Sequence, residues 1–77
     1  MKKYFLISVW HPHKGSTEES PAYALGPYNY IADYPLEEIR PYYCYSSEKK
    51  AQRYADKLTT LYTHCKVIEI PYAALAH

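Results

Sequence analysis

The chain has 77 residues and a net charge of +1, with 48% hydrophobic and 22% charged residues. These values exclude a disordered chain, which combines low hydrophobicity with high net charge, and an overall field that would attract nucleic acid or anionic membranes. At this length we expect one domain over residues 1–77, with a thin core and little room for a deep active-site cleft. The unusual feature of the composition is eleven tyrosines.

Residues 3–10 (KYFLISVW) are β-branched and aromatic-rich, which predicts a buried strand with Phe5, Ile7 and Val9 on its core face. A polar loop with a glycine and two prolines follows over 11–21. The apolar start lacks the small-residue cleavage site of a signal peptide. No apolar run approaches the ~20 residues of a membrane span. We therefore expect a cytoplasmic protein.

Residues 22–32 predict a second extended segment, interrupted at Gly26-Pro27. A short helical turn is expected near 35–39, because Pro35 suits a first-turn position and the following glutamates favour the positive end of a helix. Tyr42 to Tyr45 indicate another short strand.

The strongest local signal is an amphipathic helix over about 47–63. Ser46 or Ser47 provides an N-cap, and Glu48 lies in the first turn. Apolar residues then recur at helical spacing on a single stripe: Ala51, Tyr54, Ala55, Leu58, Leu61 and Tyr62. Residues 66–71 predict a final strand, with Ile68 and Ile70 facing inward.

This order of elements predicts an α+β fold, with a small three- to four-stranded, mostly antiparallel sheet covered on one face by the single helix. The strand at 42–45, the helix and the strand at 66–70 would form a right-handed crossover. The first strand would lie between those two strands.

Cys44 and Cys65 flank opposite ends of the predicted helix, too far apart for a disulfide, so we expect two free thiols. His11, His13, His64 and Cys65 are potential metal ligands without a standard spacing. If the first and last strands run parallel, these histidines lie at opposite ends of the sheet. We therefore expect no metal site, and we expect no other cofactor.

Seven of the tyrosines lie within residues 23–45, and the stretch 14–47 carries a net charge of −3. Exposed tyrosines give large, rigid contact areas and are enriched at protein interfaces. Their rings would also stack on bases, but the carboxylates here would repel phosphates. An acidic, tyrosine-rich surface suits a basic protein surface better. The candidate protein-binding residues are Tyr23, Tyr28, Tyr30, Tyr34, Tyr42, Tyr43, Asp33, Glu37 and Glu38.

Basic side chains recur along the outward face of the predicted helix. The candidate nucleic-acid-binding residues are Lys49, Lys50, Arg53 and Lys57. Such a row can contact phosphates, although a solvated helix face has the same pattern. No catalytic motif is present: the sequence has neither a nucleophile elbow nor a phosphate-binding glycine loop. We expect a protein that is not an enzyme.

The segment from Tyr42 to Tyr72 contains a strand, a helix that starts with Ser-Ser-Glu-Lys-Lys-Ala, and a strand that reads Lys-Val-Ile-Glu-Ile-Pro. In style it resembles short phage-type accessory proteins, among them anti-CRISPR proteins, over about 30 residues. The resemblance implies a small single-domain inhibitor without catalytic residues, and it assigns no role to any residue.

These observations favour a non-enzymatic protein-binding module, for example an inhibitor encoded by a mobile element that occupies a basic, nucleic-acid-handling surface of a host protein. The alternative is a nucleic-acid-binding protein that uses the basic helix face. A structural homo-oligomer is the third hypothesis.

Overall fold

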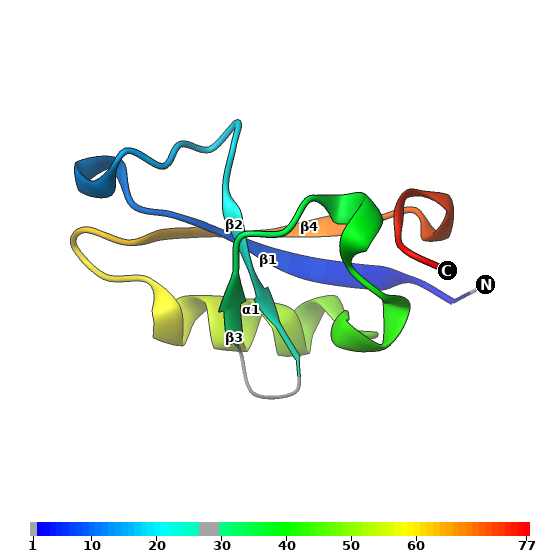
Figure 1. Cartoon of the computed structure of the whole chain (residues 1–77). Helices are drawn as coiled ribbons and strands as arrows, with labels where there is room; N and C mark the ends of the chain where they lie inside the picture. Colours follow the sequence, from blue (N-terminus) through cyan, green and yellow to red (C-terminus); the bar gives the residue numbers. More distant parts are fainter. Residues whose placement is uncertain (1, 27–29) are drawn as a thin grey trace.

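The computed structural model of the chain describes residues 2–26 and 30–77. Four strands form one antiparallel sheet in the order β3-β2-β1-β4, and one α-helix packs beside it (Figure 1). The bounds are β1 Tyr4–Trp10, β2 Ala22–Leu25, β3 Tyr30–Ala32, α1 Glu48–Leu58 and β4 His64–Ile70. Short 3-10 helices complete the chain at Pro12–Lys14, Leu36–Glu38, Pro41–Tyr43 and Tyr72–Ala74. The predicted α+β class, the antiparallel sheet and the helical turn near 35–39 are confirmed.

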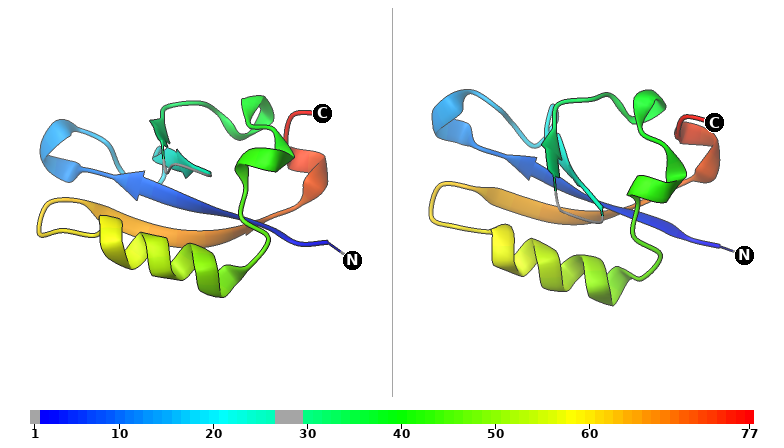
Figure 2. Two further views of the ribbon diagram at one scale, coloured as in Figure 1. Left: turned by 90° about the horizontal axis from the view of Figure 1, so that it is seen from below. Right: turned by 60° about the horizontal axis from the view of Figure 1, so that its bottom comes forward.

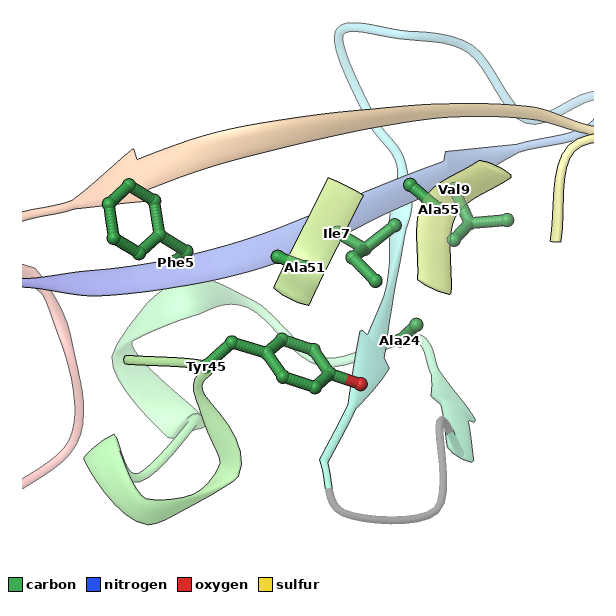
Figure 3. Packing of buried hydrophobic residues seen from close by; sticks show 7 residues of the cluster. All are labelled: Phe5, Ile7, Val9, Ala24, Tyr45, Ala51 and Ala55. Carbon is green, nitrogen blue, oxygen red and sulfur yellow. The ribbon is translucent and has the colours of Figure 1, made fainter. Parts of the chain in front are cut away.

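The helix covers one face of the sheet, over β1 and β4. Successive residues of a strand point to opposite faces, so Phe5, Ile7 and Val9 share the face toward α1. They form a cluster with Ala51 and Ala55 of the helix, which are almost fully buried (Figure 3). Two alanines at the contact let the helix lie close to the sheet. The predicted core face of β1 is therefore confirmed.

The opposite face of the sheet is also buried, against segments that contain no α-helix or strand. Leu6 of β1 is fully buried there, in a second cluster with Ile39 and Leu75. The 3-10 helices of 36–43 and the C-terminal turn lie on this side, away from α1 (Figure 2). The amide of Ala76 donates to the carbonyl of Ile39 at 2.9 Å and ties the two segments together. β1 therefore lies between two apolar layers, one on each face of the sheet.

The predicted strand at 42–45 does not form. Pro41–Tyr43 is a 3-10 helix instead, because proline fixes φ near the helical value and lacks the N–H that a strand ladder needs. Only Tyr45 pairs with the sheet, through two hydrogen bonds of 2.8 Å with the backbone of Phe5. The expected right-handed crossover is therefore also wrong, and β4 pairs with β1 antiparallel rather than parallel.

The helix begins where the sequence predicts and ends earlier. Ser47 is the N-cap, and its Oγ accepts a hydrogen bond from the amide of Lys50 at 3.2 Å. The predicted end near 63 is wrong, because α1 ends at Leu58 and Thr59 is extended. The chain must turn there to enter β4, so Leu61 is 82% exposed instead of buried.

The prediction that Ile68 and Ile70 of β4 face inward is confirmed, although the sequence does not indicate which face of the sheet they occupy. Ile68 and Ile70 belong to the second cluster, away from the helix, while Cys65 and Val67 pack toward it. Register explains this, because Val67 pairs with Ile7 and cross-strand partners share a face. Over the described ranges 2–26 and 30–77, none of the helices has the length and apolar character needed to cross a membrane.

Candidate functional site

A groove of about 510 Å³ lies beside the second cluster, between β3 and the 36–43 segment. We call it the tyrosine groove, and its lining is Leu25, Gly26, Tyr30, Tyr34, Glu38, Ile39, Arg40 and Tyr43. Its floor is apolar, because Leu25 and Ile39 are buried there. Tyr30 and Tyr34 are 66% and 50% exposed, so their rings present apolar surface to solvent at the rim. Such a site favours a ligand with flat apolar groups.

The sheet and one close backbone contact position the groove. Tyr30 pairs with Leu25 across β2 and β3, which places both side chains on the face away from α1. The amide of Gly26 donates to the carbonyl of Tyr43 at 2.8 Å. A Cβ at position 26 would lie 3.3 Å from that oxygen, which is tighter than ordinary contact. Glycine therefore lets the end of β2 approach the 3-10 helix that carries Tyr43.

Tyr42 and Tyr43 form a pair of adjacent rings. Their centroids lie 4.2 Å apart, and the Tyr42 hydroxyl donates to the Tyr43 hydroxyl at 2.8 Å. An extended strand would have sent them to opposite faces, but the 3-10 turn brings them side by side. The hydrogen bond to Tyr43 raises the pKa of Tyr42, with a smaller contribution from burial, so its phenol stays protonated. Tyr42 is 69% exposed.

A smaller, acidic depression of about 310 Å³ adjoins the groove, and Tyr34 belongs to both. Its lining is Glu19, Ser20, Pro21, Tyr23, Asp33, Tyr34 and Pro35. We call it the acidic depression. Burial raises the pKa of Tyr23, which keeps this phenol neutral beside the carboxylates. Asp33 and Glu19 are exposed.

Three of the predicted carboxylates have no ion-pair partner in the described part of the chain. The salt bridge found there joins Lys66 Nζ and Glu18 Oε2 at 3.6 Å. Asp33, Glu37 and Glu38 are all exposed. Their charge is available to a cationic ligand and increases the electrostatic attraction to it.

The structure brings together much of the predicted protein-binding set. Tyr30, Tyr34, Tyr43 and Glu38 line the tyrosine groove. Tyr23 and Asp33 line the acidic depression. Tyr42 lines a third depression of about 470 Å³, which shares Gly26 with the tyrosine groove. Glu37 is exposed on the Leu36–Glu38 turn, outside these linings. Tyr28 lies outside the described residues.

Sequence reasoning missed Arg40 and the groove floor. Arg40 is a cation within a stretch that the charge pattern marks as acidic, and it lines the groove together with Glu38. Ile39 is 1% exposed and was expected only as part of a turn. No local signal identifies these residues as part of a groove, because the groove forms only when their segment packs beside Leu25 and Tyr30, which are distant in the sequence.

The basic row on α1 is exposed over its whole length. Lys49, Lys50, Arg53 and Lys57 all lie on the outer surface of the helix. Lys57 Nζ is 5.8 Å from the centroid of the Tyr54 ring, which is close enough for a cation–π contact. The row and the tyrosine groove are built on opposite sides of the sheet.

The histidines gather at one end of the sheet, so the expectation that they lie at opposite ends is wrong. Antiparallel pairing of β1 and β4 sets His64 beside Trp10, with ring centroids 5.8 Å apart. His13 lies 5.1 Å from the Tyr62 ring and 6.0 Å from His11. In residues 2–26 and 30–77, no three His, Cys, Asp or Glu side chains are arranged to hold a metal ion.

Both cysteines are free, as predicted. Burial raises the pKa of the Cys44 thiol to about 11. Burial also raises the pKa of Cys65, which packs under α1, while a hydrogen bond with Thr59 lowers it. Protonated thiols are poor nucleophiles. Both cysteines therefore act as apolar packing residues beside the core.

Comparisons of the chain with protein-family models, with curated proteins and with solved structures found no match. The geometry of the site is therefore the basis of the functional proposal.

Proposed function

We propose that this protein is a non-enzymatic protein-binding module that docks on a basic surface of another protein through the tyrosine groove and the acidic depression. The observation that carries the proposal is the grouping of Tyr30, Tyr34 and Tyr43 around one apolar floor, with exposed carboxylates beside them. Aromatic anchors that become buried on binding dominate the energetics of protein interfaces, and the rim around them is polar.

The charge of the site supports a protein partner over a nucleic acid. Glu38 is in the groove, and Asp33 and Glu19 are in the adjoining depression. These carboxylates would repel phosphates, although tyrosine rings by themselves stack well on bases. A partner surface that itself binds nucleic acid carries the complementary lysines and arginines. A small domain seated there would act as a competitive inhibitor.

The proposal is tested with Tyr34→Ala and a matched control, Tyr62→Ala. The two tyrosines are 50% and 52% exposed, so both changes remove a similar exposed ring. Tyr62 lies at the histidine end, beside His13, and does not line the groove. Tagged proteins are used to capture partners from a host lysate treated with nuclease, and the affinity of each captured protein is then measured.

We expect the wild type and Tyr62→Ala to bind the captured protein equally and Tyr34→Ala to lose on the order of 2 kcal/mol or more of binding free energy. Equal affinities for all three proteins would refute the proposal. Sedimentation of the same samples separates binding to a partner from self-association, which is the outcome expected of a structural homo-oligomer.

A second candidate function is nucleic-acid binding, favoured by the exposure of all four cations on α1. Its test is the affinity for a short labelled oligonucleotide at several salt concentrations, with the triple variant Lys49→Glu, Arg53→Glu and Lys57→Glu as comparison. We expect only the nonspecific range, roughly 10⁻⁴–10⁻⁶ M at physiological salt. Submicromolar, salt-sensitive binding that disappears in the triple variant would establish this function instead.

A further inference from the structure

The tyrosine groove and the acidic depression are neighbours, because Tyr34 lines both. The groove offers about 510 Å³ over an apolar floor, and the depression adds about 310 Å³ beside it. We call the two neighbouring hollows, with the half-exposed ring of Tyr34 that both share, the track. A track with two adjoining hollows suits an extended chain better than a compact side chain or a flat protein surface.

The side chains of the groove match the chemistry of proline. Tyr30, Tyr34 and Tyr43 surround it, and two of them are at least half exposed. Polyproline II segments dock in aromatic-lined grooves, because they are already extended and lose little entropy on binding. Tyrosine rings provide flat apolar faces for the pyrrolidine ring, and their hydroxyl groups remain available to the peptide carbonyls.

The charges give the track a direction. Asp33 and Glu19 lie in the acidic depression, whereas Arg40 is in the groove. In the part of the chain that the structure describes, neither carboxylate makes a salt bridge, while the neighbouring Glu18 pairs with Lys66. A lysine or arginine of the ligand is therefore attracted to the depression more than to the groove, where the opposite charges of Glu38 and Arg40 offset each other.

Addition of a strand to the sheet is the other way in which an extended peptide could bind here. β3 is the edge strand at this side, but it has only three residues. Affinity in strand addition comes from main-chain hydrogen bonds along an edge, and so short an edge provides few of them. The side chains of the track provide more contact than the backbone of β3.

We infer that the track binds an extended, proline-containing segment of the partner, with proline among Tyr30, Tyr34 and Tyr43 and a basic residue of the segment beside Asp33 and Glu19. The inference rests on the proposed function. It specifies the site on the partner as a linear segment within a basic surface. A short peptide contains all the groups that the track would contact, so it should bind without the rest of the partner protein.

The test is selection from a phage-displayed library of short random peptides on immobilised wild-type protein, with counter-selection on Tyr34→Ala. We expect an enriched consensus that contains proline and, at a fixed distance from it, lysine or arginine. A synthetic, fluorescein-labelled peptide with this consensus is then titrated. Tyr34→Ala should weaken its binding about thirtyfold. Tyr62→Ala should leave the binding unchanged.

The orientation of the bound peptide in the track is tested by charge reversal in the acidic depression. Asp33→Lys should weaken binding of the consensus peptide roughly tenfold, and a peptide with glutamate in place of its basic residue should recover part of the loss. Glu69→Lys is the control, because Glu69 is exposed on β4 and lines neither hollow. Equal effects of Asp33→Lys and Glu69→Lys would overturn the inferred direction.

Failure of this inference is distinguishable from failure of the proposed function. If no peptide is enriched, or if the consensus lacks proline and a basic residue, the linear-segment inference is wrong. In that case, capture of a folded partner that still depends on Tyr34 would leave the proposed function standing. Loss of Tyr34 dependence in both experiments would overturn the two together.

Discussion

Replacement of Ile39 by alanine tests whether the second apolar layer stabilises the fold. Ile39 is 1% exposed and packs on the face of the sheet away from α1. The change removes three buried carbon atoms, worth about 2.4 kcal/mol at ~0.8 kcal/mol each, and the cavity adds a further cost. We therefore expect a loss of about 3–4 kcal/mol of unfolding free energy. At roughly 4–8 °C per kcal/mol, the melting temperature should fall by more than about 12 °C.

The control is Ile31→Ala, which removes the same atoms from β3. Ile31 is 45% exposed, so about half of its surface is already in water and little cavity forms. We expect a cost of about 1.3 kcal/mol, a little over half of the value for three fully buried carbon atoms. Both variants are measured by thermal and urea unfolding followed by circular dichroism. Equal melting temperatures would show that the 36–43 segment does not pack on the sheet, and the tyrosine groove would then lack its floor.

Leu58→Asp places a charge on the apolar stripe of α1 and should cost several kcal/mol, whereas Lys57→Asp, one position away and exposed, should cost only about 1 kcal/mol, from the loss of the contact with Tyr54 and from an anion in the last turn; similar melting temperatures would mean that the helix phase is wrong. Ser47→Ala removes the N-cap acceptor and should cost ~1 kcal/mol in urea unfolding, while Ser46→Ala should cost little; a larger loss for Ser46→Ala would contradict the cap assignment. The pKa of Cys44 is raised to about 11 in the folded protein, so alkylation near pH 8 should be about a hundredfold slower than for a thiol with the ordinary value of 9.0, and rapid native labelling would refute its burial. Because that folded pKa lies above the unfolded value, the contribution of Cys44 to stability should be complete below pH 9.0 and decline as the pH rises toward about 11, which urea unfolding across this range would measure.

Local chemistry was sufficient to predict the elements whose signals lie within a few residues. The start of α1 follows from Ser47 and Glu48, and the spacing of Ala51 and Ala55 identifies its buried face. The central strand follows from its β-branched and aromatic residues. The grouping of tyrosines and carboxylates over 23–45 predicted which stretch forms the candidate site, although it did not predict which side chains meet.

Tertiary structure decided the direction of strand pairing and the covering of the second face of the sheet. Parallel and antiparallel pairing bury the same side chains of β1, so its sequence does not distinguish them. The antiparallel register of β1 and β4 brings His64 to Trp10 and sends Ile70 away from the helix. Tyrosine-rich sequence around 42–45 has high strand propensity, but on that edge of β1 the residues from Ile7 to Val9 pair with β2, and the 42–45 segment forms only the bridge at Phe5.

The sequence by itself determined the helix start, the central strand and the accumulation of tyrosines beside acidic residues, because each depends on neighbours along the chain. Only the tertiary structure decided that Tyr30, Tyr34 and Tyr43 surround one groove above Ile39. Those residues belong to an edge strand, a loop and two separate turns. Their meeting depends on the second apolar layer and on the contact between Gly26 and the backbone of Tyr43, which are long-range interactions that local propensity does not encode.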